Sequence, residues 1–172
     1  MITKELSSTV YDYYLKGRLD EDFVMDAIKQ TLTGDVTRAS DNEDKYDHID
    51  FWWDSPKKGR IGIDVKGLRK NDRTDNHTDD STQWLELTNV NGNKGWLYGK
   101  AEYIAFRTNS NIIFAKRTKL LNFILEKIKD KTITHTNPQT FYIPYQRKDR
   151  QDVIVKAPTN DIINLADFLI TF

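Results

Sequence analysis

The sequence predicts a single α/β domain in which helices flank a central mixed β-sheet. Two patterns predict this class: apolar residues recur at helical spacing in several stretches, and shorter segments between them alternate apolar with polar side chains. The 172 residues are 38% apolar and 30% charged, with 4 Pro and 8 Gly, a composition typical of one globular domain. The chain has no internal repeat, so we expect residues 1–172 to share one fold.

The first 33 residues are predicted to be helical, with a break at Gly17. Three carboxylates at residues 20–22 open the second helix, where they suit the positive end of the helix dipole, and Gly34 ends it. The apolar stripe of this second helix consists of Phe23, Val24, Ala27, Ile28 and Leu32. Residues 35–47 are acidic and non-periodic, which predicts a loop.

Strands are predicted in the middle of the chain. Residues 48–53 and 60–66 alternate apolar and polar side chains, with a Ser-Pro-Lys-Lys-Gly turn between them. A third strand at 82–90 would extend them into an antiparallel meander. The other expected elements are strands 101–107 and 111–117, a helix over 118–131, strands 140–146 and 152–158, and a closing helix over 160–168.

Charge and composition exclude several functional classes. With 26 basic and 26 acidic residues, the chain has no global basic field. The absence of cysteine excludes disulfides, thiolate zinc sites and thiol nucleophiles, and the three histidines lack zinc-ligand spacing. No stretch approaches the ~18 consecutive apolar residues of a membrane span. We therefore expect a soluble, cytoplasmic protein with no export signal and no membrane partner, and its abundance of Lys, Asn and Ile fits an AT-rich viral or bacterial genome.

Candidate catalytic residues lie on the first two predicted strands. Asp64 and Lys66 are two residues apart on one strand, so they share a face, while the apolar residues of that strand point to the other. Asp50 lies on the preceding strand with Ile49 and Phe51 facing oppositely, so the three polar side chains can converge. Two carboxylates suit Mg²⁺ or Mn²⁺, which polarises a phosphoryl oxygen and activates water. Lys66 would orient that water or stabilise the charge of the transition state.

This pattern resembles the PD-(D/E)xK nuclease superfamily, whose signature is an Asp on one strand and an acidic-x-Lys triplet on the next, after a helix that carries an acidic residue. The matching residues are Asp50 and Asp64-Val65-Lys66, and the order of elements is similar over residues 19–130. No proline precedes Asp50, a departure at the most variable part of the family pattern. The resemblance implies a restriction-endonuclease-like or Holliday-junction-resolvase-like core, Mg²⁺ or Mn²⁺ as cofactor, and catalytic roles for Asp50, Asp64 and Lys66.

The resemblance also implies further ligands. The carbonyl of Val65 would bind the metal, and Glu21 is the preferred helix acid. The alternatives to Glu21 are Asp22, Asp26 and Glu5. In this superfamily a polar side chain on the next strand often completes the site, which makes Gln83 or Glu86 an accessory residue. These two have opposite parity, so both face the site only if the strand is bulged.

Plainer interpretations of the same residues stay open. An acidic-x-Lys triplet is expected about once by chance in a chain of this length, and Glu43-Asp44-Lys45 is a second one. Asp64 and Lys66 would also suit a solvated charge pair on an exposed sheet face. Asp50 would suit a turn, and Glu21 the first turn of any helix.

Two other groups of residues favour structural roles. The acidic residues 41–47 lack the Gly and Glu of a calcium-binding loop, so we interpret them as solvated. The four tryptophans are interleaved with aliphatic residues and are expected in the core. The exception is the turn Gly95–Gly99, where Trp96 or Tyr98 suits either an anchor or a DNA contact.

The zero net charge conceals a local charge separation. Residues 57–73 contain seven basic and two acidic side chains, whereas residues 35–54 contain seven acidic and two basic ones. The basic segment includes the strand of Lys66, where a phosphate backbone would lie. The expected nucleic-acid contacts are Lys57, Lys58, Arg60, Arg69, Lys70 and Arg73. DNA is therefore the expected partner.

These observations predict a Mg²⁺-dependent DNA endonuclease of a structure-specific, restriction or repair type. A homodimer would supply the two sites that cutting both strands requires. The alternative is a non-catalytic module on the same fold that binds a nucleic acid or a protein. Residues 139–172 lie beyond the resemblance, and their apolar content favours packing against the sheet edge.

Overall fold

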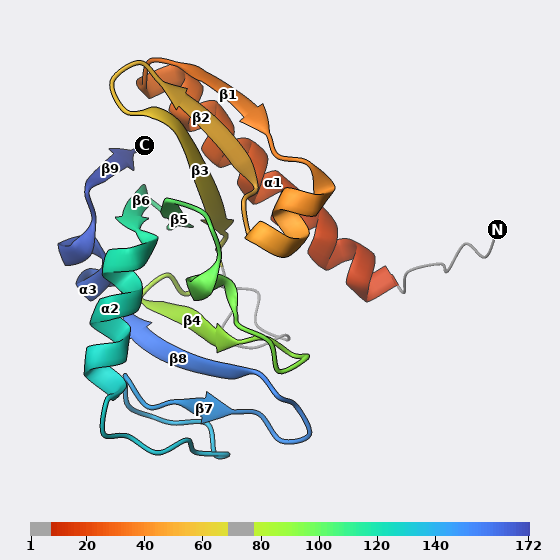
Figure 1. The fold of residues 1–172 in the computed structure, drawn as a ribbon, viewed down its shortest axis with the longest axis vertical. Coiled ribbons are helices and arrows are strands. Elements are labelled where there is room, and N and C mark those ends of the chain that lie inside the picture. The colour runs from red at the N-terminus through yellow and green to blue at the C-terminus, as the bar shows by residue number, and fades with distance from the viewer. Residues whose placement is uncertain (1–7, 69–77) are drawn as a thin grey trace.

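The computed structural model describes residues 8–68 and 78–172, and it describes the side chains of the first helix from Leu15 onward (Figure 1). The helices are α1 (Ser8–Thr31), α2 (Arg117–Ile128) and α3 (Thr159–Leu165). A π-helical turn, η1 (Glu43–Asp47), and a 3-10 turn, η2 (Trp96–Tyr98), lie in the connections between strands. The fold is α/β with a mixed sheet, as predicted.

A six-stranded sheet with the order β1-β2-β3-β5-β6-β9 forms the centre of the fold. Its strands are β1 (Asp35–Arg38), β2 (Phe51–Ser55), β3 (Gly59–Lys66), β5 (Tyr103–Arg107), β6 (Asn111–Lys116) and β9 (Phe168–Thr171). β3 and β5 are parallel, and the other neighbours are antiparallel. A parallel pair needs a long crossover. Here the crossover carries β4 (Thr82–Thr88) and η2.

A second, three-stranded sheet has the order β4-β8-β7, with β8 at Val153–Pro158 and β7 at Tyr145–Gln146. The predicted meander is therefore wrong for its third strand, because β4 leaves the large sheet and pairs with β8. Alternation shows which face of a strand is apolar but does not identify the neighbouring strand. The buried side chain of Leu85 places the apolar face of β4 in the core described next.

Two hydrophobic cores lie on opposite faces of the large sheet. The first, between α1 and the sheet, includes Val24, Met25, Ile28, Phe51, Ile63, Val65 and Phe114. The second, bounded by the small sheet, η2, α2 and α3, includes Leu85, Trp96, Phe106, Leu120, Ile124, Val155 and Ile162. Since alternate residues of a strand point to opposite faces, Asp64 and Lys66 lie on the side of the second core. The long crossover of the chain thus covers the face that carries the candidate site.

The N-terminal third differs from the prediction in three places. α1 runs through Gly17 without a break; a Cβ at this position would meet nothing within 4 Å, and a helical glycine costs only about 1 kcal/mol. The segment predicted as the loop 35–47 contains β1 and η1. β1 is a short, largely exposed edge strand, so it carries no apolar alternation. β2 begins at Phe51 instead of residue 48, because His48 adopts a left-handed conformation with φ 54°.

The C-terminal third is also rearranged. The predicted strand 140–146 is reduced to β7, and the predicted closing helix ends at Leu165. β9 follows and pairs with β6, where the Phe168 ring stacks on Phe114 with 4.4 Å between centroids. The strands β3, β5, β6 and β8 and the helix α2 are confirmed. In the described part of the chain, none of the helices is long and apolar enough to cross a membrane.

Candidate functional site

The candidate site lies where β3 extends past the start of β2. The first residue of β2, Phe51, pairs with Ile63, so Val65 has no β2 residue opposite it. The side chain of Asp50 takes that place: its Oδ2 accepts a hydrogen bond from the Val65 N–H at 2.6 Å, while its own N–H donates to the Ile63 carbonyl at 2.9 Å. The orientation of the Asp50 carboxylate is therefore fixed by the backbone of β3.

Asp64 is a buried carboxyl group with an incomplete set of partners. Its side chain is on the same strand face as Lys66, whose Nζ lies 2.5 Å from Oδ1. Oδ2 is buried and has no hydrogen-bond partner among the described residues. Burial raises the pKa of Asp64 to about 8; the Lys66 charge opposes this rise and the nearby Asp50 carboxylate adds to it. The arrangement thus leaves a buried oxygen that a second cation would stabilise.

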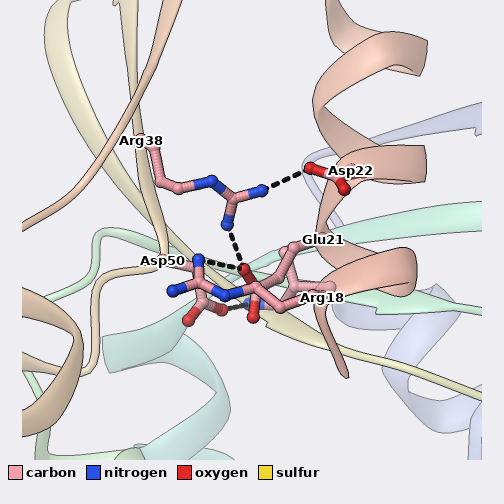
Figure 2. Close-up of polar contacts among 6 residues, drawn as sticks. Arg18, Glu21, Asp22, Arg38 and Asp50 are labelled. Carbon is pink, nitrogen blue, oxygen red and sulfur yellow. Dashed lines mark hydrogen bonds and ion pairs between the residues drawn. The ribbon is translucent and has the colours of Figure 1, made fainter. Parts of the chain in front are cut away.

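Among the candidate helix acids, the structure brings Glu21 to Asp50. Burial raises the pKa of Glu21, and the charge of Asp50 adds to this rise, while hydrogen bonding to Arg38 lowers it. Figure 2 shows Arg18 of α1 and Arg38 of β1 both reaching the Glu21 carboxylate, with Asp50 beside it. Arg38 also binds Asp22. The result is an ion-pair network that ties the edge strand β1 to α1 next to the site.

The alternative helix acids are placed elsewhere. Asp22 has a side chain that is 59% exposed and is held by Arg38 at the surface. Asp26 forms an exposed ion pair with Lys29, one helical turn away. Glu5 lies outside the described residues. Of the candidate helix acids that the structure describes, Glu21 is therefore the one brought to Asp50.

Two further titratable residues lie near the site: Asp44, from the segment predicted as a solvated acidic loop, and His48, which was predicted to begin a strand. The pKa of Asp44 in η1 is raised by burial and by the charge of Asp50. The pKa of His48 is lowered by burial and by the charge of Lys66. The π-helical turn that brings them close leaves no periodic signal in the sequence. Asp44 belongs to the second acidic-x-Lys triplet, but its spacing alone did not indicate this position.

Trp96 provides a further neighbour of Lys66. The indole is 5% exposed, and Lys66 Nζ lies 4.7 Å from the ring centre. Of the two roles that the sequence leaves open for Trp96, an anchor or a DNA contact, burial favours the anchor.

The accessory candidates on β4 have other neighbours. Gln83 is buried, and its Nε2 donates to Thr159 Oγ1 at 3.1 Å, which links β4 to α3. Glu86 lies against Gly95, because a Cβ added to that glycine would be 2.5 Å from the Glu86 carbonyl oxygen. Gln83 is therefore a structural link between elements.

Of the expected basic contacts that the structure describes, Lys57 and Lys58 lie far from Lys66. Lys57 and Lys58 lie in the turn before β3, and the seven residue steps from Gly59 to Lys66 span about 23 Å of strand. Lys58 Nζ donates to the Tyr103 hydroxyl at 3.0 Å. Arg60 shares the face of Lys66, where its guanidinium stacks on Trp52 with 4.8 Å to the ring centre. The other expected contacts, Arg69, Lys70 and Arg73, lie outside the described residues.

The donor set suits a small, hard cation with few protein ligands. Among residues 8–68 and 78–172, no three His, Cys, Asp or Glu side chains are grouped closely enough to hold a metal ion. Mg²⁺ is commonly bound by one or two carboxylates together with water and substrate oxygens. Asp50, oriented by Val65, and Asp64, with its unpartnered Oδ2, form such a pair. Comparison with known proteins gave no match to any protein family, curated protein or solved structure.

Proposed function

We propose that this protein is a Mg²⁺- or Mn²⁺-dependent deoxyribonuclease with a restriction-endonuclease-like core. Asp50 and Asp64 would hold the metal, with the carbonyl of Val65 as a further ligand, and Lys66 would be the catalytic lysine. Glu21 would act as a neighbouring acid, because no three such side chains of the described residues are grouped closely enough to bind one ion. The observation that carries the proposal is Asp64, a buried carboxyl group with a lysine on one oxygen and no partner on the other. The order of helix acid, Asp and Asp-x-Lys along the chain supports it.

Burying a carboxyl group on a sheet face costs stability unless it is paired, so we expect a compensating interaction for Asp64. A bound divalent cation would supply it, and the metal would polarise a phosphoryl oxygen and lower the pKa of a coordinated water. Asp50 contributes through its fixed orientation, because the Val65 N–H holds one of its oxygens. Both N–H and C=O of a strand residue point to the same strand edge, so the Val65 carbonyl lies along that edge too.

Lys66 contributes a positive charge that is already in place before a substrate arrives. Its ammonium group donates one hydrogen bond to Asp64 Oδ1, and its aromatic neighbour is Trp96. The ammonium group has three donors, so it can also reach a phosphate oxygen or the attacking water. Negative charge grows on the phosphoryl oxygens in the transition state, and a fixed cation there stabilises the transition state more than the ground state.

DNA is the proposed substrate, and a homodimer is the proposed way of cutting both strands. The basic residues on and before β3 support a phosphate-binding role, with Arg60 on the same face as Lys66. Lys57 and Lys58 lie at the opposite end of β3 from Lys66, so a duplex that touched both ends would have to extend along this strand. This suits a substrate with several phosphates more than a mononucleotide.

A specific observation favours the second candidate function, a non-catalytic binding module. Lys66 and Arg38 already pair with Asp64 and Glu21, and the described residues contain no group of three metal-ligating side chains. A module of this kind would bind DNA or a protein without requiring the metal. The two functions therefore differ in whether Asp64 and Lys66 are needed for the measured activity.

The test is a nuclease assay on supercoiled plasmid, single-stranded circles and a four-way junction, with Mg²⁺, Mn²⁺ or EDTA. We expect metal-dependent cleavage that falls by at least about 100-fold in Asp64→Asn and Lys66→Ala. Asp26→Asn and Lys29→Ala remove the same charges from the surface pair on α1 and should leave the rate unchanged. Unaltered DNA affinity in all four variants without cleavage would refute the nuclease and support the binding module.

A further inference from the structure

We propose that Trp96 is a positioning residue for Lys66, and that the turn Gly95–Gly99 holds the lysine ammonium and the segment leading to Asp50 in a fixed relation. The catalytic consequence rests on the proposed nuclease function. The positioning itself does not, because it concerns contacts within the chain alone.

The contact between the two side chains has the geometry of a cation–π interaction. Lys66 Nζ is 4.7 Å from the centre of the Trp96 ring, within the ~6 Å over which such contacts are attractive. Trp96 is 5% exposed, so water competes little with the ring for the ammonium. Asp64 Oδ1 is the other partner of the ammonium, at 2.5 Å. A lysine side chain has four rotatable bonds, and two different contacts at its tip restrict it to a small set of conformations.

The turn that carries Trp96 is fixed at both ends by close backbone approach. A Cβ added at Gly95 would lie 2.5 Å from the Glu86 carbonyl oxygen, so the turn is pressed against β4. A Cβ added at Gly99 would lie 2.8 Å from the His48 Cβ and 2.9 Å from the Asp47 carbonyl oxygen. Both neighbours would have to shift to admit any other residue. The two glycines are therefore required by contact with β4 on one side and with the end of η1 on the other.

Hydrogen bonds also connect the same turn to η1 and to Arg117, the first residue of α2. The Lys100 N–H donates to the Asp47 carbonyl at 2.7 Å, which joins the end of the turn to η1. The half-buried Arg117 donates from Nη1 to the Leu97 carbonyl at 3.0 Å and from Nε to the Ala101 carbonyl at 2.9 Å. Asp47 lies three residues before Asp50. One turn thus contacts both the ammonium of Lys66 and the segment that delivers Asp50.

The Trp96 ring is itself held in the second core. Its neighbour there is Phe106, with an edge-to-face contact and 6.2 Å between centroids. The plain alternative is that Trp96 only fills this core and that its contact with Lys66 is incidental. The alternative predicts that any apolar side chain of similar volume would serve, whereas positioning of a cation needs an aromatic face.

The variants Trp96→Phe and Trp96→Leu separate these readings, since the first keeps an aromatic face and the second does not. Trp84→Leu is the matched control: Trp84 also faces a lysine, with Lys156 Nζ 5.1 Å from its ring, but on the small sheet. The first measurement is an NMR spectrum of the full chain with ¹³C-labelled lysine in EDTA, in which Lys66 is identified by the signal lost in Lys66→Ala. Wild-type Lys66 Hε signals should be shifted upfield by the indole ring current, less so in Trp96→Phe and not in Trp96→Leu.

The second measurement is the steady-state cleavage rate. Trp96→Leu should lower kcat by about 10- to 30-fold with KM for DNA unchanged, which is the range expected for losing one desolvated cation–π contact. Trp96→Phe should lower kcat by a smaller factor, and Trp84→Leu should keep the wild-type kcat.

The outcomes are distinguishable. An unshifted Lys66 signal in the wild-type chain overturns the positioning proposal whether or not the protein cleaves DNA. Equal loss of kcat in Trp96→Phe, Trp96→Leu and Trp84→Leu also overturns it, because that pattern reports stability alone. A shifted signal in a protein that cleaves nothing supports the positioning of Lys66 and refutes the nuclease. If Trp96→Leu does not fold, the smaller shift in Trp96→Phe decides the question.

Discussion

Replacing Asp64 by asparagine should remove a large part of the pH dependence of stability. Burial raises the pKa of Asp64 from its ordinary value of 3.8 to about 8 in the folded chain. Between these values the folded chain keeps a proton that the unfolded chain has released. The unfolded state binds fewer protons there, so the free energy of unfolding falls as the pH rises. The stabilising contribution is complete below the unfolded pKa and is lost as the pH rises through the folded pKa.

The size of the effect follows from the pH interval. One pKa unit corresponds to about 1.4 kcal/mol, so raising the pH from 5 to 7 should remove about 3 kcal/mol of stability through Asp64. This is a large share of the 5–15 kcal/mol, roughly, that stabilises a typical domain. Asparagine at position 64 has nearly the same shape and no proton to lose. The raised pKa values of Glu21 and Asp44 act in the same direction in both proteins, so the difference between the two slopes isolates Asp64.

Urea denaturation followed by circular dichroism at pH 5, 6 and 7 in EDTA measures the two slopes. Asp26→Asn, which removes an exposed carboxylate of α1, is the matched control and should keep the wild-type slope. Adding Mg²⁺ should restore stability to the wild-type protein at pH 7 more than at pH 5, because a cation favours the ionised carboxylate. Equal slopes in the wild-type and Asp64→Asn proteins would refute the reasoning. An equal effect of Mg²⁺ on both proteins would remove Asp64 from the metal ligands.

Three further predictions concern stability. Gly17→Ala should stabilise α1 by about 0.5–1 kcal/mol and raise the thermal midpoint, because a Cβ there meets nothing within 4 Å; a lower midpoint would contradict the continuous helix. Tyr103→Phe should cost about 1–2 kcal/mol in urea denaturation by removing the hydrogen bond that its hydroxyl donates to Asp167, and no loss would show that this link is dispensable. Arg147→Met should cost about 2–4 kcal/mol in urea denaturation at pH 7 by leaving the fully buried Asp152 without its ion-pair partner; an unchanged free energy of unfolding would contradict this cause.

The sequence predicts best where stability depends on local alternation. The apolar residues of β3 face the first core as expected, because a half-buried strand requires this pattern. β1 could not be predicted from apolar alternation, because it is stabilised by pairing with β2 at an exposed edge. The small sheet could not be predicted for the related reason that β4 and β8 are far apart in sequence. Long-range pairing is decided by packing between elements, which no single segment records.

The structure brings the candidate site residues together partly as predicted and partly through contacts that the sequence did not indicate. Parity placed Asp64 and Lys66 on one face, and the structure places them so. For Asp50 the parity argument is wrong: Ile49 packs in the second core and Phe51 in the first, since β2 has not yet begun at residue 50. Asp50 reaches Val65 because it continues the hydrogen-bond ladder with its side chain. The positions of His48 and Trp96 near Lys66 depend on turns that bring distant segments together, and spacing in the sequence cannot reveal them.

The pairing of β4 with β8 has a consequence for the order in which the candidate site is assembled during synthesis. Asp50, Asp64 and Lys66 are all synthesised in the first 66 residues, but the crossover that bears Trp96 gains its sheet partner only when β8 emerges at Val153–Pro158. The large sheet then closes with β9 near the end of the chain. A nascent or truncated chain would therefore hold the acidic residues and the lysine without the frame that aligns them. The C-terminal segment contributes none of the proposed ligands, and yet its strands β8 and β9 complete the two sheets that frame them.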